Sequence, residues 1–477
     1  MIMEHHRGQW GSNIGFLMAT VGAAVGLGNI WGFPYKMGAS GGFPFLIIYI
    51  ALAVLVGFPI MLTELAIGRK SGKSVLVSYQ NVAGGMGTFL GFLAIISPLL
   101  ILSFYTVLGA YCIQYVCLNF AELIGVFSLS SISGAQSFTD MLSNQPLAIG
   151  STVFFIAICY LIIRGGIKDG IEKFNKIGMP ALAIMLLIVI IRAVTLPGAF
   201  EGLKFMFSPN WEPFSSVQGF LKVLSTAGGQ MFFSLSLAMG ITVTYGSYLS
   251  KKESLVKNSL IIIISDTCVA IMAGLAVLPA AFALGGAGAE LSGPKLLFIT
   301  MQDVFNSMGA FGPIFGILFF LFVTLAAITS AIALVEVLVT FVIDHQVAKG
   351  RSPKRSRIVA IACLIVLAEA VLVAADGLGS NGLWIPFQDT GMTLGGTWLD
   401  FMDFISEGVA MPLGALVMSI LVGWVIGPKV IRNEVSLEGN TMGDGLYSFF
   451  SICIRFVAPV AMAFILYGQV TTFISPA

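Results

Sequence analysis

The sequence has few charged residues: only 10% of its 477 positions are Asp, Glu, Lys or Arg. Soluble domains carry about 25%, so this scarcity excludes an ordinary globular enzyme. The three histidines form no cluster of potential metal ligands, and the six cysteines lie in apolar segments with no CxxC spacing. The sequence therefore gives no zinc motif and no disulfide framework.

What the sequence has instead is a series of apolar runs of about 20 residues, the length that a bilayer crossing requires. The first run is not followed by a small-residue cleavage site, so we do not interpret it as a removable signal peptide. These runs predict a polytopic α-helical membrane protein. The eleven predicted crossings are Ile14–Lys36, Gly42–Ile67, Phe89–Leu118, Ala148–Ile163, Gly178–Val194, Val223–Leu249, Leu255–Leu284, Gly312–Ile343, Ile358–Ala375, Phe401–Ile426 and Leu446–Ile474.

The basic residues lie in alternate connections between these crossings. The connections Ala121–Pro146 and Asp376–Asp400 contain no Lys or Arg. The positive-inside rule then predicts a cytoplasmic N-terminus and, after eleven crossings, an extracellular C-terminus in the plasma membrane. We interpret basic runs such as "KGRSPKRSR" as topology signals rather than as a nucleic-acid surface.

Two crossings contain features that weaken a helix. The first has "TVGAAVGLGNIWGFPY" (Thr20–Tyr35), and the sixth (Ser225–Tyr248) has Gly228, Gly229 and Gly240 around a serine-rich centre. Glycine costs about 1 kcal/mol relative to alanine inside a helix, although glycines in one membrane helix can also indicate close helix packing. "GLGNIWG" lacks the preceding strand and the spacing of a dinucleotide-binding loop.

Two interrupted crossings five crossings apart have opposite orientations, as in the inverted repeats of secondary transporters. We therefore predict a single transporter domain over 1–477. Its first repeat is 14–194, its second is 223–426, and 446–474 is an additional helix. Unwound backbone within a bilayer is tolerated only where it is buried in protein or lines a cavity, so the weak segments predict the binding site.

Four stretches resemble the first, sixth, eighth and tenth crossings of the neurotransmitter:sodium symporters. They are "WGSNIGFLMATVGAAVGLGNIWGFPY", "GQMFFSLSLAMGITVTYGSY", "AAITSAIALVEV" and "LDFMDFISEG". The eleven crossings are similar to the bacterial amino-acid branch of that family. The resemblance implies an all-α LeuT-type fold with a 5+5 inverted repeat, discontinuous first and sixth helices, and alternating access.

The resemblance also implies two sodium sites, and oxygen ligands suit such a hard cation. One site would use the carbonyls of Gly22, Val25 and Ala326 with the hydroxyls of Thr329 and Ser330. The other would use the Ala24 carbonyl, the Asn29 amide, the Ser234 hydroxyl, the Asp266 side chain and the substrate carboxylate. Alone, adjacent Thr and Ser would more simply bond back to their own helix.

The family usually has asparagine at the position of Asp266, and a carboxylate in mid-membrane costs about 2.5–3.5 kcal/mol. We hypothesise that Asp266 supplies the negative charge that chloride supplies in many relatives, which makes transport chloride-independent. A purely structural, hydrogen-bonded aspartate is the alternative.

Gly26 stands where monoamine carriers have aspartate, so the resemblance implies a substrate that brings its own carboxylate. That carboxylate would meet Tyr105, within an apolar pocket in which Met239 tolerates varied shapes. We therefore expect hydrophobic and aromatic amino acids as substrates. The implied substrate-binding residues are Ala24, Gly26, Ile101, Tyr105, Phe233, Ser234, Ser236, Met239, Ser330 and Leu334.

The implied gates are unequally supported. The inner-gate residues Arg7, Trp10, Tyr248 and Asp344 match the family, with an Arg7–Asp344 pair closing the path. The outer-gate acid matches at Asp403, but Gly32 replaces the family's arginine, and Lys36 lies one turn further on.

Two further features match the family pattern. Gly170 and Pro180 have the spacing of a fifth-helix unwinding signal, for which a simple proline kink is the alternative. Glu64 matches a glutamate that braces unwound backbone.

We thus predict sodium-coupled amino-acid symport with no enzymatic step. The competing interpretations are a proton-coupled carrier of the same architecture, in which Asp266 titrates, and a channel. A channel would need rings of pore-lining charge, and none is evident in the sequence.

Overall fold

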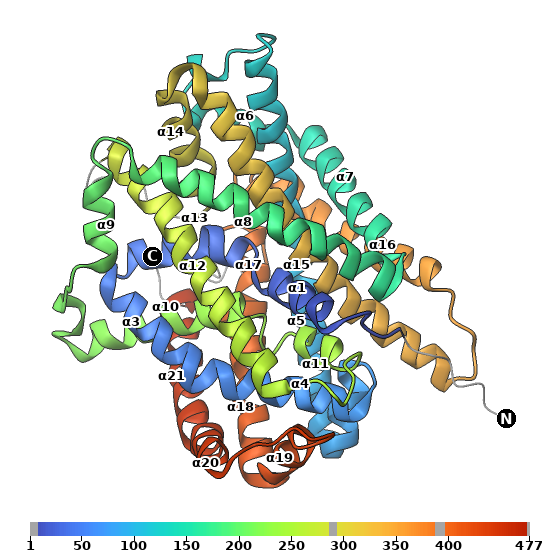
Figure 1. Ribbon diagram of the computed structural model, residues 1–477. Coiled ribbons are helices and arrows are strands. Elements are labelled where there is room, and N and C mark those ends of the chain that lie inside the picture. Colours follow the sequence, from blue (N-terminus) through green and yellow to red (C-terminus); the bar gives the residue numbers. More distant parts are fainter. Residues whose placement is uncertain (1–7, 286–292, 387–395, 475–477) are drawn as a thin grey trace.

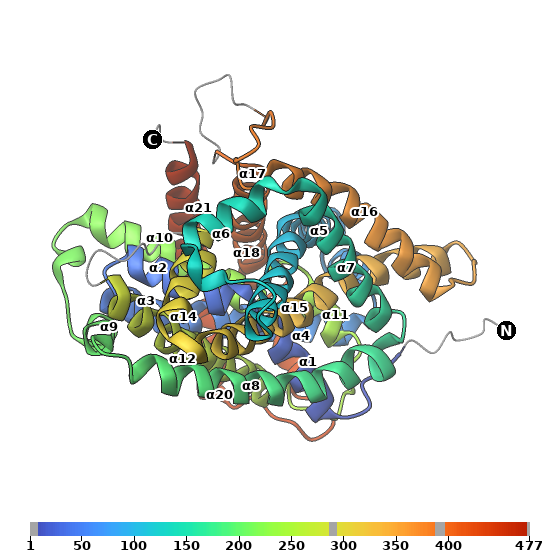
Figure 2. The same ribbon diagram turned by 90° about the horizontal axis from the view of Figure 1, so that it is seen from above.

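The computed structural model describes residues 8–285, 293–386 and 396–474, and the regular structure in these ranges is helical. Figure 1 shows the helices crossing one another around the long central pair α5 (Val75–Leu123) and α15 (Gly312–Ala348). Over its most apolar stretch α15 is 78% buried inside the protein, whereas α7 (Gln145–Ile163) is 33% buried. The central helices therefore form the core, and α7 lies at the periphery (Figure 2).

Nine helical stretches among the described residues are long and apolar enough to cross a membrane, and the bent pair α1–α2 makes a tenth. The remaining predicted crossing is the pair α10–α11, which is interrupted for six residues. The other bounds are α1 Asn13–Ala24, α2 Phe33–Ala39, α3 Phe43–Leu52, α4 Phe58–Ser71, α8 Lys173–Val194, α10 Val217–Ser234, α11 Ile241–Gly246, α12 Leu255–Gly285, α16 Arg355–Asp376, α17 Trp398–Asp403, α18 Met411–Ile420, α20 Asp444–Ile452 and α21 Ala458–Ile474.

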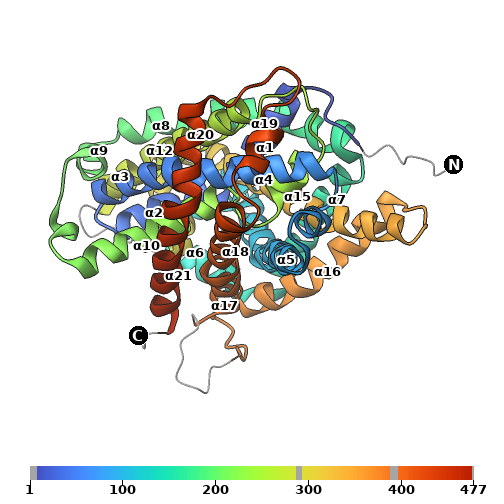
Figure 3. The ribbon, with the colours of Figure 1, turned by 90° about the horizontal axis from the view of Figure 1, so that it is seen from below.

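Short helices that hydropathy does not reveal fill the connections. One of these short helices, α6, lies in the predicted connection Ala121–Pro146 and packs beside the ends of α5 and α7. The short helices are α6 Gly134–Ser143, α9 Ala199–Phe207, α13 Gly293–Lys295, α14 Met301–Ser307 and α19 Lys429–Val435. Viewed from below, α20 and α21 run across the near face of the molecule (Figure 3).

The third predicted crossing, Phe89–Leu118, lies within α5. That element starts at Val75, but its backbone is non-helical at Ala83 and Gly84, so the crossing belongs to the helical part after this break. The fifth begins with a π-helical segment, Ile167–Glu172, rather than at Gly178. Three of the six residues in that segment are charged (Lys168, Asp169 and Glu172), so a hydropathy window misses a turn that is nevertheless helical.

The first crossing breaks where the glycines predict. Val25 follows α1 with an extended ψ of 94°, and a π-helical turn then leads into α2, bent by 46° from α1. Hydrogen bonds between neighbouring residues hold this turn: the Gly26 carbonyl accepts from the N–H of Asn29 at 3.1 Å and from the N–H of Ile30 at 3.3 Å.

The sixth crossing breaks at Leu235–Gly240, between α10 and α11. Ser236 and Ala238 have φ of 54° and 59° there, a left-handed conformation that costs a non-glycine residue about 1–2 kcal/mol. Tertiary contacts hold it: Glu64 is fully buried and accepts from the Ala238 N–H at 2.9 Å, as expected of a bracing glutamate.

The glycine pair of the sixth crossing does not cause this break. Gly228 and Gly229 lie inside α10, and a Cβ on Gly228 would come within 2.2 Å of Ile465. These two glycines therefore allow α21 to pack closely against α10, which is the alternative that membrane-helix glycines commonly indicate.

Candidate transport site

The two broken crossings meet against α15, and one carbonyl group joins all three elements. The carbonyl of Ala23, at the end of α1, accepts from the Ser330 hydroxyl of α15 at 3.0 Å and from the Ser236 hydroxyl at 3.1 Å. Breaking the α1 helix frees such carbonyls from their intrahelical partners. The unwound backbone thus presents oxygen atoms toward hydroxyls from two other elements.

A small cavity of about 20 Å³ lies at this junction, enough for about one water molecule. Nine of the ten predicted substrate residues line it, all except Ser234. They are Ala24, Gly26, Ile101, Tyr105, Phe233, Ser236, Met239, Ser330 and Leu334. Ala23, Gly28 and Ile241 also line it, and the sequence interpretation did not name them as substrate residues. Side chains must therefore move before a substrate the size of an amino acid can enter.

Gly26 fixes how closely the backbone approaches this cavity. A Cβ at this position would lie 2.3 Å from both the Ser330 Oγ and the Tyr105 hydroxyl oxygen. The Tyr105 hydroxyl accepts from the Leu27 N–H at 2.9 Å, so it also holds the unwound segment. Any side chain at Gly26 would displace these two polar groups.

Asp266 lies at one side of the junction, fully buried. Its carboxylate accepts from the Asn29 amide at 2.8 Å, from the Tyr49 hydroxyl at 3.1 Å and from the Ser234 hydroxyl at 3.0 Å. The described residues supply no Lys or Arg ion pair to it. The structure thus brings together the three side chains predicted for one sodium site, and Ser234 points toward Asp266. Tyr49 was missed, because no motif marks it.

The residues predicted for the other sodium site lie where α1 contacts α15. Ser330 Oγ is 3.4 Å from the Gly22 carbonyl, whereas the Thr329 hydroxyl donates to the Ala326 carbonyl of its own helix at 2.9 Å. Asn175 of α8 also faces this contact: its Oδ1 has no hydrogen-bond partner among the described residues and would lie 2.2 Å from a Cβ on Gly22. This buried acceptor was not predicted.

Comparison with known proteins decides the identity. The model of the sodium:neurotransmitter symporter family matches residues 7–126 and 136–477. The chain belongs to this family. An uncharacterised sodium-dependent transporter of Bacillus subtilis is 32% identical to the symporter over 458 residues, which cover 95% of this chain and 96% of the relative. One of Methanocaldococcus jannaschii is 31% identical over 448 residues, covering 90% and 84%.

The fold agrees with this assignment. The crystal structure of MhsT in complex with L-phenylalanine superposes with a TM-score of 0.84 at 32% identity, covering 97% of this chain and 100% of that one. The family and the LeuT-type fold predicted from the sequence are confirmed. The symporter is a multi-pass membrane protein for sodium-coupled transport of a small molecule, and it is not an enzyme.

At the predicted inner gate, Trp10 closes over the end of the sixth crossing. Its indole N–H donates to the Tyr245 carbonyl at 3.1 Å. The Asp344 carboxylate accepts from the Ser74 N–H at 2.5 Å. Arg7, the predicted partner of Asp344, lies outside the described residues.

Tyr248 of the inner gate belongs to a polar network that the sequence interpretation missed. Its hydroxyl donates to Glu336 at 2.9 Å, and Glu336 pairs with Arg355 at 2.5 Å. The Arg355 guanidinium also donates to the Ile163 carbonyl at the end of α7. The network thus joins the sixth, eighth and ninth crossings to the end of the fourth.

On the predicted outer side a second cavity, of about 600 Å³, lies beyond the first. Phe233 lines both cavities and therefore separates them. Lys36 forms an ion pair across the outer cavity with Glu407 rather than with Asp403, which also lines it. The Gln230 side chain fills the space beside Gly32, with its Oε1 2.8 Å from where a Cβ would lie.

The fifth crossing is tied to the first through the segment predicted to unwind. Gly170 lies in the π-helical turn and Pro180 within α8. Between them, the Glu172 carboxylate accepts from the Gly11 N–H at 2.7 Å and from the Ser12 hydroxyl at 3.1 Å. Glu172 therefore holds the chain that leads into α1.

Proposed function

We propose that this symporter couples sodium to the uptake of hydrophobic and aromatic amino acids by alternating access. The observation that carries this proposal is the junction cavity: its lining is mainly apolar, yet Tyr105, Ser330 and freed main-chain groups of the first crossing supply polar contacts at one side. Such a site suits an apolar side chain together with a carboxylate. The similar structure of MhsT holds L-phenylalanine.

We further propose two sodium sites, one at each side of the cavity. Site 1 comprises Asn29, Ser234, Asp266 and the Ala24 carbonyl. Site 2 comprises the Thr329 and Ser330 hydroxyls with the carbonyls of Gly22, Val25 and Ala326. Because site 1 and the substrate share ligands, each should raise the affinity for the other, and this reciprocity couples the inward sodium gradient to uptake.

Asp266 makes transport chloride-independent in this proposal. Its three hydrogen-bond donors are neutral, so the carboxylate can supply a full negative charge beside sodium. Replacing chloride by gluconate should leave uptake unchanged, and a collapse of uptake would reject this part of the proposal.

The gates follow from the same geometry. Lys36 and Glu407 close the outer path, with Asp403 beside them, and Phe233 closes over the substrate. Trp10, Tyr248 and Asp344 close the inner path, and unwinding between Gly170 and Pro180 opens site 2 to water. This arrangement assumes a plasma-membrane protein with repeats 14–194 and 223–426, a cytoplasmic N-terminus and an extracellular C-terminus.

The test is uptake into proteoliposomes made with the purified protein. Labelled phenylalanine should accumulate when sodium is outside and should be competed by leucine, tyrosine and tryptophan more strongly than by glutamate or lysine. Replacing sodium by choline at constant pH should abolish uptake. Undiminished uptake in choline would favour the proton-coupled alternative, and a flux that does not saturate with substrate would favour a channel.

A further inference from the structure

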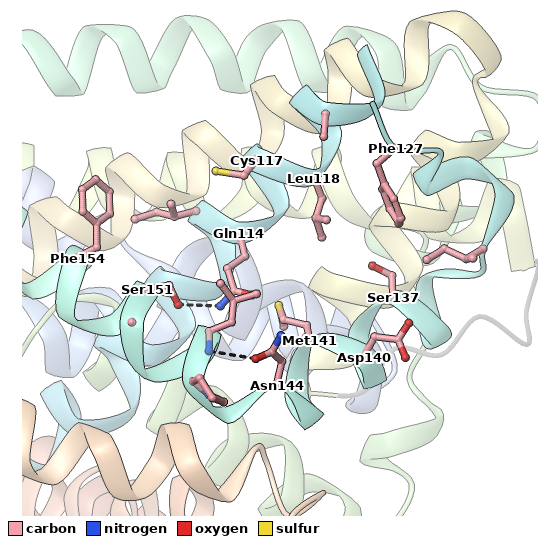
Figure 4. Close-up of a pocket in the computed structure, with 16 residues that line it drawn as sticks. Gln114, Cys117, Leu118, Phe127, Ser137, Asp140, Met141, Asn144, Ser151 and Phe154 are labelled. Atoms are coloured by element: carbon pink, nitrogen blue, oxygen red, sulfur yellow. Dashed lines mark hydrogen bonds between the residues drawn. The ribbon is translucent and has the colours of Figure 1, made fainter. Parts of the chain in front are cut away.

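A groove of about 670 Å³ lies between the ends of α5 and α7 and the short helix α6, on the predicted outer side (Figure 4). It shares no lining residue with the transport cavity or with the outer cavity. Its volume falls within the range of about 300–1,000 Å³ that is typical of ligand pockets. The groove is therefore separate from these two cavities.

One part of the groove follows the lipid-facing side of α7. Leu147 and Phe154 line it and are 49% and 57% exposed. From Pro146, the first residue of α7 that lines the groove, to Phe154 the helix rises about 12 Å. One leaflet is half of the roughly 30 Å hydrocarbon core of a bilayer. The apolar part therefore extends over most of the length of one leaflet.

The other part of the groove is polar and carries negative charge. Asp140 is the one charged side chain among the described residues that line it, and it accepts from Gln136 at 2.7 Å. Buried Gln114 donates to Ser151 at 2.7 Å, and no residue that the structure describes donates to its Oε1. Both groups are acceptors, and the lining described by the structure offers no Lys or Arg to an anion.

We propose that this groove binds one acyl chain of a membrane phospholipid with a primary ammonium headgroup, phosphatidylethanolamine. The chain lies along α7, and the ammonium donates to the Asp140 carboxylate, with Gln114 Oε1 as a further acceptor. Hydrogen bonds between ionised partners are roughly twice as strong as neutral ones. A phosphatidylglycerol headgroup would instead bring a net negative charge toward Asp140 with no cationic group to offset it.

The headgroup is tested by native mass spectrometry of the full-length protein after equilibration with equal amounts of phosphatidylethanolamine and phosphatidylglycerol of identical chains. The wild type should retain the ethanolamine lipid about fivefold more, the most that an exposed ion pair of ordinary strength supplies. Asp140→Asn should remove this preference. Asp169→Asn, which makes the same charge change outside the groove, should keep it.

The chain position is tested by filling the groove. A Cβ at Gly150 meets no atom within 4 Å, so Gly150→Trp can enter the groove without disturbing the backbone and should reduce retention of both lipids. Leu161→Trp, on the same helix outside the groove, should not. Sodium-driven uptake by each variant verifies folding. Equal retention of the two lipids by the wild type, or unchanged retention by Gly150→Trp, would overturn the proposal.

Discussion

The ion pair between Lys36 and Glu407 allows the outer gate to be tested quantitatively. The two side chains are 16% and 9% exposed, which places the pair between a surface salt bridge, worth about 0–1 kcal/mol, and a buried one, whose disruption costs about 3–5 kcal/mol. Removing one partner should therefore destabilise the closed outer gate by about 2 kcal/mol, or roughly 30-fold in the ratio of closed to open states.

The assay is the accessibility of a single cysteine at Thr226, which lines the outer cavity, to a charged thiol reagent added from outside in the presence of sodium. Lys36→Met should speed the modification by about 10- to 30-fold. Glu407→Gln should have a similar effect, and the double variant should not exceed either single variant, because it removes the same interaction and leaves neither charge of the pair without its partner. The exposed cysteines Cys117 and Cys268 are replaced beforehand.

The control is Arg432→Met, which breaks the exposed pair between Arg432 and Asp444 at a distant surface. A surface pair of this kind contributes little, so the cysteine should react at the wild-type rate. The reasoning would be refuted if Asp403→Asn opened the gate while Glu407→Gln did not, because the closing charge would then be at the position where the family places it.

Three further perturbations test the site and its supports. Gly26→Ala would place a methyl group 2.3 Å from two hydroxyl oxygens, so scintillation-proximity binding of labelled substrate should fall at least about tenfold, a loss near 1.4 kcal/mol; unchanged binding would contradict the close approach. Glu336→Gln leaves Arg355 without its charged partner and should lower stability by about 3 kcal/mol, seen as an earlier thermal transition that Glu438→Gln does not produce. Glu172→Gln weakens the cap on the first crossing, so hydrogen exchange over residues 8–24 should rise about tenfold; equal exchange in both proteins would rule out the cap.

Much of this protein follows from local sequence physics. Runs of apolar residues define the crossings because the bilayer accepts only backbone that is hydrogen-bonded within its own segment. The break in the first crossing is also local, since Gly26 and Gly28 weaken the helix where the carbonyls turn toward the site. The family motifs predicted ten substrate residues, and nine of them line one cavity in the structure.

The break in the sixth crossing was located less well. Of the three glycines that drew attention, Gly240 lies in the break with a φ of 79°, whereas Gly228 and Gly229 pack against α21. The other left-handed residues in the break are Ser236 and Ala238. Neither residue type favours that conformation. Glu64, more than 170 positions away in sequence, stabilises it, so local propensity could not have indicated it.

The sequence alone determined that the chain crosses a membrane, where the first crossing weakens and which residue types line the site, because hydropathy and backbone freedom are properties of short segments. Only the tertiary structure decided that Lys36 pairs with Glu407, that Tyr49 joins Asp266 and that Asn175 faces Gly22. Each of these contacts joins segments far apart in the chain. Two groups form an ion pair or a hydrogen bond only when they lie close together in space, and that distance cannot be read from their positions in the sequence.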